Sequence, residues 1–163
     1  MKLRNQQRAP QRTLFGAGPH VSPILHWRDS ALIDYLGSSL RLQLDTDQHQ
    51  AVRENDVLHL PLPPGATERQ IQDAAESWLR REAELLFVRT ITRETQRTDR
   101  DMPTLSLSFS SRGSWIQVED RVLRLNWRLI EQPLPVIEHA LRRAVAMLPV
   151  KTTTVDLFSA VAS

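Results

Sequence analysis

Hydrophobic and polar residues alternate in two short runs in the first half of the chain. Residues 39–44 and 57–62 place leucine at every second position, which is the period of a strand with one buried face. A polar stretch separates the two runs, so we predict that they form a hairpin. His59 falls on the polar side of the second run, beside Pro61. We therefore expect it to face solvent at a sheet edge.

The hydrophobic pattern then changes to a helical period. Pro63-Pro64-Gly65 ends the second run, and Thr67 followed three residues later by Gln70 is a capping-box signature. The sequence predicts a helix over residues 67–95. The residues expected on its apolar stripe are Ile71, Ala74, Ala75, Trp78, Leu79, Leu85 and Leu86, and those expected to face water are Arg80, Arg81, Glu82 and Glu84.

Alternation returns after a charge-dense loop over residues 95–103. We expect strands over residues 104–109, 115–118 and 122–130, with a tight turn at Glu119-Asp120-Arg121 between the last two.

Two prolines, Pro133 and Pro135, introduce a second predicted helix, and Pro149 ends it. Its apolar stripe is formed by Ile137, Ala140, Leu141, Ala144 and Leu148. A further helical turn is expected over residues 155–161, where it would pack Leu157 and Phe158. Together these elements predict an α+β fold with a mostly antiparallel sheet, a long helix, and a second helix packed against it.

Composition divides the chain into an arm and one domain. The first 27 residues contain Lys2, Arg4, Arg8 and Arg12 but no acidic residue, which predicts a flexible basic arm over residues 1–27. The remaining residues, 28–163, are enough for one core and too few for two. No apolar run is long enough to span a membrane and no export signal is recognisable, so a soluble, cytoplasmic protein is expected.

Charge and cysteine content exclude several kinds of chemistry. The chain has no cysteine, which excludes disulfides, thiolate nucleophiles and cysteine-based metal sites. Its formal net charge is only +2, with 21 basic and 19 acidic residues, so overall charge is weak evidence for nucleic-acid binding. A glycine-rich phosphate loop and a Gly-x-Ser-x-Gly turn are also missing.

Three segments, in this order, resemble the YgjP-like family of bacterial metal-dependent hydrolases, zincin-type relatives of the WLM and SprT-like peptidases. The first is Tyr35-Leu36-Gly37 with the strand that follows it. The second, residues 58–87, contains a Leu-Pro-Leu-Pro-Pro-Gly-Ala turn and a Trp-Leu-Arg-Arg-Glu-Ala helix. The third comprises Ser110-Ser111-Arg112-Gly113, the Leu-Asn-Trp-Arg-Leu strand at 125–129, and Pro135-Val136-Ile137. The resemblance extends from about residue 27 to residue 161 and implies a zincin-type α+β fold.

In the resembled family the helix after this strand carries H-E-x-x-H, which holds zinc and supplies the general base. The resemblance places Arg143 and Met147 at the two histidine positions, Ala144 at the glutamate and Thr153 at a third histidine, while Phe109 replaces a cysteine. Arginine has no lone pair to give a metal, a thioether is a soft donor, and alanine accepts no proton. We therefore expect no zinc cofactor, no other metal site and no catalytic residues.

Three functions remain open at this point. The favoured one is a catalytically inactive, metallopeptidase-like protein that acts as a binding or regulatory module for a protein partner, with Arg112, His139, Arg142 and Arg143 as candidate binding residues. The second is nucleic-acid binding through the basic arm together with Arg142 and Arg143. The third is a residual metal-dependent hydrolase with other ligands. The five histidines argue against the third, because no two are three or four residues apart on a predicted helix. Partner identity and oligomeric state stay open.

Overall fold

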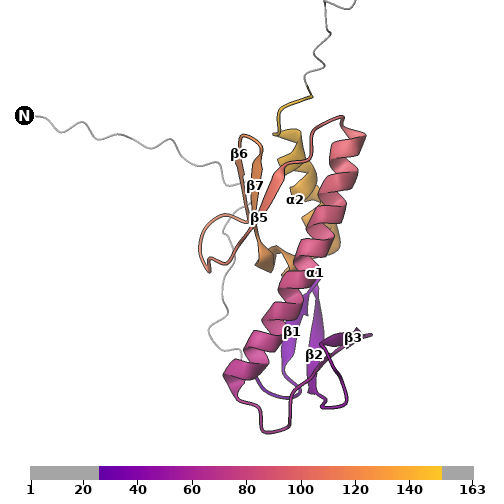
Figure 1. The fold of residues 1–163 in the computed structure, drawn as a ribbon, viewed down its shortest axis with the longest axis vertical. Helices are drawn as coiled ribbons and strands as arrows, with labels where there is room; N and C mark the ends of the chain where they lie inside the picture. The colour runs from indigo at the N-terminus through magenta and orange to yellow at the C-terminus, as the bar shows by residue number, and fades with distance from the viewer. Residues whose placement is uncertain (1–25, 152–163) are drawn as a thin grey trace, which may run out of the picture.

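A thirty-residue helix, α1 (Glu68–Arg97), runs through the structure, with a small sheet beside each of its halves (Figure 1). The structure is a computed structural model that describes residues 26–151. The first sheet has the strand order β1-β2-β4-β3 and the second β5-β7-β6. The strands are β1 (Leu32–Tyr35), β2 (Ser38–Leu44), β3 (Val52–Glu54), β4 (Val57–Leu60), β5 (Thr104–Ser108), β6 (Ile116–Glu119) and β7 (Val122–Asn126). A 3-10 helix, η1 (Trp127–Glu131), and a second α-helix, α2 (Leu134–Ala146), complete the described part.

The long helix forms where the sequence predicts it. The Thr67 side chain accepts a hydrogen bond from the Gln70 backbone, and the Gln70 side chain accepts one from the Thr67 backbone. This reciprocal capping box satisfies two N–H groups that a helix start otherwise leaves without partners. The helix ends two residues later than predicted, and Ile71, Ala75, Trp78, Leu79, Ala83, Phe87 and Ile91 form its buried stripe.

Leu85 does not belong to that stripe, contrary to prediction. Leu85 is 65% exposed, whereas Ala83 and Phe87, two residues before and after it, are buried. Two residues correspond to about 200° around a helix, so a core that follows Ala83 and Phe87 turns Leu85 to the opposite face.

The predicted hairpin between the first two leucine runs is wrong. β2 and β4 are neighbours but run parallel, with Leu42 opposite Leu58 and Leu44 opposite Leu60. The intervening stretch contains the short strand β3, which turns back onto β4, while β1 pairs with β2 on the other side. The leucines still share one buried face, because a period of two determines the face of a strand and not its direction.

His59 is consequently not an edge residue facing solvent. β4 lies between β2 and β3, and the His59 side chain is only 13% exposed. Its Nδ1 lies 3.4 Å from an Asp45 carboxylate oxygen and its Nε2 lies 3.6 Å from one of Glu54. The polar side of β4 is therefore covered by its neighbours.

The second sheet confirms the hairpin predicted at Asp120. β6 and β7 are antiparallel, and β5 adds parallel to β7. The last strand is shorter than predicted because it ends at Asn126, whose side chain accepts a hydrogen bond from Arg128 N at 3.0 Å and caps η1. Three of the five pairings between these strands are antiparallel, and the predicted α+β class is confirmed.

The second helix also forms as predicted. Pro135 lies in its first turn, and all five residues of its expected apolar stripe are buried. Thr153, the turn predicted over residues 155–161 and the basic arm as far as residue 25 lie outside the described residues. Within residues 26–151, no helix combines the length and hydrophobicity needed to cross a membrane.

A glycine turn joins the first sheet to the segment that precedes α2. Leu36 N and Gly37 N donate to the carbonyl oxygens of Ile130 and Glu131 at 2.8 and 3.0 Å. Gly37 has a φ of +78°, and a Cβ there would lie 2.9 Å from Pro133 Cα. The position therefore requires both the conformation and the size of glycine.

Replacing Gly37 with alanine is expected to lower the free energy of unfolding by about 2 kcal/mol or more, through backbone strain and the contact with Pro133. Urea unfolding followed by circular dichroism measures the change. Gly65→Ala is the matched control, because nothing lies within 4 Å of a Cβ at that position. Equal midpoints for Gly37→Ala and the unsubstituted protein would contradict the role given to this turn.

Candidate functional site

The three described positions at which the resemblance leads us to expect H-E-x-x-H lie at the end of α2. Arg143 and Met147 are four residues apart and both exposed, so they share the outer side of the helix. Ala144 is 0% exposed and lies in the core, on the stripe that includes Ala140 and Leu148. The position matched to the glutamate is thus enclosed by protein.

These residues do not fit a zinc ion. A guanidinium has no donor electron pair, a thioether suits soft metals, and a methyl group is neither ligand nor base. Nowhere in residues 26–151 are three His, Cys, Asp or Glu side chains placed so that they could hold a metal ion. No reaction step through a metal can be derived from this arrangement.

The four predicted binding residues are divided between two regions. His139, Arg142 and Arg143 lie on the exposed side of α2. Arg112 lies in the loop between β5 and β6, which Figure 1 shows apart from α2. The same loop is tied to the end of β7, because Asn126 Nδ2 donates to the Ser110 carbonyl at 2.8 Å.

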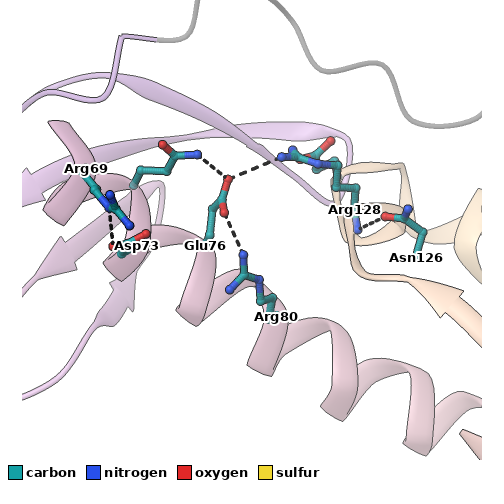
Figure 2. A network of polar contacts seen from close by, with 8 residues as sticks. Arg69, Asp73, Glu76, Arg80, Asn126 and Arg128 are labelled. Carbon is teal, nitrogen blue, oxygen red and sulfur yellow. Dashed lines mark hydrogen bonds and ion pairs between the residues drawn. The ribbon is translucent and has the colours of Figure 1, made fainter. Parts of the chain in front are cut away.

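A buried carboxylate network connects α1 to η1, and sequence reasoning missed it (Figure 2). The Glu76 side chain is 9% exposed. It accepts hydrogen bonds from Gln72 Nε2 at 3.1 Å, Arg80 Nη2 at 2.9 Å and Arg128 Nη2 at 3.4 Å. Arg128 Nη1 also donates to Glu131 at 3.0 Å. The network therefore determines where η1 lies on α1, and with it where α2 begins.

Aromatic rings complete this network. The Arg128 guanidinium lies 4.5 Å from the ring centre of the buried Trp127. Arg80, predicted to face water, lies 5.3 Å from the same ring and 5.2 Å from the ring of Phe109. Such positions favour cation–π attraction. The Leu-Asn-Trp-Arg-Leu segment and Phe109 are thus residues that hold the framework together.

Burial raises the pKa values of two groups, Glu131 at the end of η1 and Tyr35 at the end of β1. Burial raises the pKa of Glu131, although the neighbouring Arg128 acts in the opposite direction. Burial also raises the pKa of Tyr35, and the nearby Glu82 carboxylate adds to the increase. The Tyr35 hydroxyl donates to Glu82 Oε2 at 3.3 Å.

A second buried carboxylate, Glu94, collects arginines from both helices. Its side chain is 5% exposed, and three guanidiniums lie within 4 Å of it. Arg97 Nη2 is 2.9 Å away, and Arg93 Nε and Arg142 Nε are each 3.8 Å away. Arg93 Nη2 also lies 3.3 Å from Glu138. Glu94 and Arg97 are three residues apart on a helix, so the sequence could have suggested this ion pair. The contact between Arg142 and Glu94 depends on the packing of α2 against α1.

An apolar groove of about 650 Å³ runs beside the middle of α1. Residues from three elements line it, among them Tyr35, Leu36, Glu82, Leu85, Val88 and Leu134. Leu85, Val88 and Leu134 are exposed. The outward-facing Leu85 is therefore part of a hollow apolar surface.

A protein-family model described as YgjP-like, metallopeptidase domain, matches residues 14–141, which is more than half of the chain. The chain belongs to the YgjP-like family. This confirms the resemblance inferred from the three segments and makes the chain metallopeptidase-like. Neither the curated proteins nor the solved structures gave a match.

The YgjP-like match covers both sheets, α1 and the Glu76 network. It begins at residue 14, within the stretch for which the sequence predicts a basic arm, and it ends at residue 141. Arg143, Ala144 and Met147 follow that end point. The match therefore does not include these three positions.

Proposed function

We propose that this YgjP-like domain is a non-catalytic binding module. One observation carries the proposal. The apolar stripe of α2 is intact and buried, while the described positions expected to hold zinc and the general base are occupied by Arg143, Ala144 and Met147. Retained packing with unsuitable chemical groups indicates a fold that is kept for something other than hydrolysis.

The burial of Ala144 supports the proposal further. A general base must reach a water molecule and its substrate, but this position is 0% exposed within the core. The outer side of the same helix carries the positive charge of Arg143, which favours an anionic group on a partner over a metal cation.

The apolar groove beside α1 also supports a binding role. Leu85, Val88 and Leu134 are exposed and line the groove together, so they form one continuous apolar surface. Contiguous exposed apolar surface of this kind is typical of sites that bind other molecules.

Zinc content tests the proposal. Protein purified without a histidine tag and dialysed against zinc is expected to retain far less than one equivalent per chain, measured by atomic emission. The matched variant Arg143→His/Met147→His places two imidazoles one turn apart on the exposed side of α2 and is expected to gain weak zinc binding. One tightly bound equivalent in the unsubstituted protein, with hydrolytic activity that a chelator abolishes, would sink the proposal.

A further inference from the structure

We propose that the arginines around Glu94 form a docking surface for the phosphate backbone of a nucleic acid. We refer to Glu94, Arg93, Arg97 and Arg142 as the Glu94 cluster. The inference rests on the proposed binding role, for which it names the chemistry of the partner.

The cluster presents three guanidinium groups at the surface. The Glu94 carboxylate is buried, whereas the three arginine side chains are between 51% and 58% exposed. Each guanidinium carries five N–H donors in a planar fork, and the contacts with Glu94 and Glu138 use only some of them. Because the side chains are more than half exposed, the remaining donors are available to phosphate oxygens, singly or in pairs.

The buried carboxylate lowers the cost of binding. A long arginine side chain normally loses rotational freedom when it binds a ligand. Here Glu94 holds Arg97 by hydrogen bonds and attracts Arg93 and Arg142 from 3.8 Å. The two carboxylates in contact with the three arginines leave one positive charge uncompensated. The arrangement is therefore partly organised for an anion.

Charge is concentrated at this end of the molecule. The described residues 26–151 contain 17 basic and 18 acidic side chains, a net charge of −1. Residues 89–101 and 134–151, which form the last part of α1, all of α2 and the segments after both helices, contain seven basic and four acidic side chains, a net charge of +3. The positive charge is therefore confined to this region, while the described residues as a whole are slightly negative, and it would attract a polyanion to this end.

The spacing of the arginines favours a nucleic acid over an acidic peptide. Arg89, Arg93 and Arg97 follow one another at intervals of four residues, which corresponds to about 6 Å along the helix axis. Arg142 lies beside this row on α2. A repeating row of guanidinium forks suits a partner whose phosphates also repeat, and it predicts binding without base recognition.

Fluorescence anisotropy with labelled random-sequence DNA, double- and single-stranded, tests the inference. We expect Arg93→Gln/Arg142→Gln to weaken binding about tenfold at low salt and to reduce the slope of log Kd against log salt by about 2. Arg81→Gln, an exposed arginine of α1 outside the cluster, is expected to change affinity less than twofold.

Several outcomes would overturn the inference. These are binding to neither form of DNA at low salt, a flat salt response, or equal weakening by Arg81→Gln and the double variant. Competition by a poly-glutamate peptide as effective as DNA of equal charge would point to an acidic protein instead. Circular dichroism of each variant shows whether it folds. Zinc content measured on the same samples reports separately on the non-catalytic proposal, so failure of one leaves the other standing.

Discussion

Replacing Ala144 with glutamate, the residue expected there from the resemblance to the family, is predicted to lower the free energy of unfolding by about 3–5 kcal/mol. Ala144 is 0% exposed and packed in the core with Ala140 and Leu141. A glutamate there would need space that the core does not offer. It would also bury a carboxyl group away from water. That group would either stay protonated or force the surrounding core residues apart so that water could reach it.

The measurement is urea or thermal unfolding followed by circular dichroism. Ala146→Glu is the matched control, since Ala146 lies two residues further along the same helix and is exposed. A glutamate near a helix C-terminus opposes the helix dipole and is expected to cost only about 0.5 kcal/mol. A stable, fully folded Ala144→Glu variant would mean that this position opens onto a cleft, and the argument from burial would fail.

Removing the Glu76 carboxylate is expected to have an effect of similar size. Glu76→Ala removes the anion shared by Arg128, whose side chain is 19% exposed, and Arg80, whose side chain is 37% exposed. Breaking a buried pair on one side costs about 3–5 kcal/mol when the remaining charge is not compensated. Because Arg128 keeps Glu131 and Arg80 is partly exposed, we expect a loss toward the lower end of that range. Arg80 Nε already lacks a hydrogen-bond partner among the described residues, so the site has little capacity to adjust.

The midpoint of urea unfolding measures this change, and Asp73→Ala is the control. Asp73 faces solvent one turn earlier on α1, where its contact with Arg69 spans 3.9 Å (Figure 2). An exposed pair of this kind contributes about 0.5 kcal/mol or less. Equal midpoints for the two variants would show that the Glu76 network does not hold η1 on α1.

Local patterns predicted the elements that depend on near neighbours. The capping box at Thr67 involves residues three apart, and the turn at Asp120 connects adjacent strands. The stripe of α2 is a repeat along one helix. Each is decided by neighbouring side chains and backbone dihedrals, so the sequence alone was sufficient.

The candidate sites depended on distant contacts. Glu76 and Arg128 are 52 residues apart, and Arg142 reaches Glu94 only because α2 packs on α1. Sequence reasoning named Arg142 but had no means of assigning it a carboxylate partner. It placed Arg80 in water, whereas the Arg80 guanidinium donates a hydrogen bond to Glu76 and lies 5.2 and 5.3 Å from the ring centres of Phe109 and Trp127.

The sequence by itself thus determined the α+β class, both helices, the β6–β7 hairpin and the membership in the YgjP-like family. Only the tertiary structure decided that β2 and β4 run parallel, that His59 is covered, that Leu85 faces outward, and that Ala144 is enclosed. The physical reason is that periodicity specifies which side of an element is apolar. Strand direction, and the partners of buried charged groups, depend on which distant segments pack against that element.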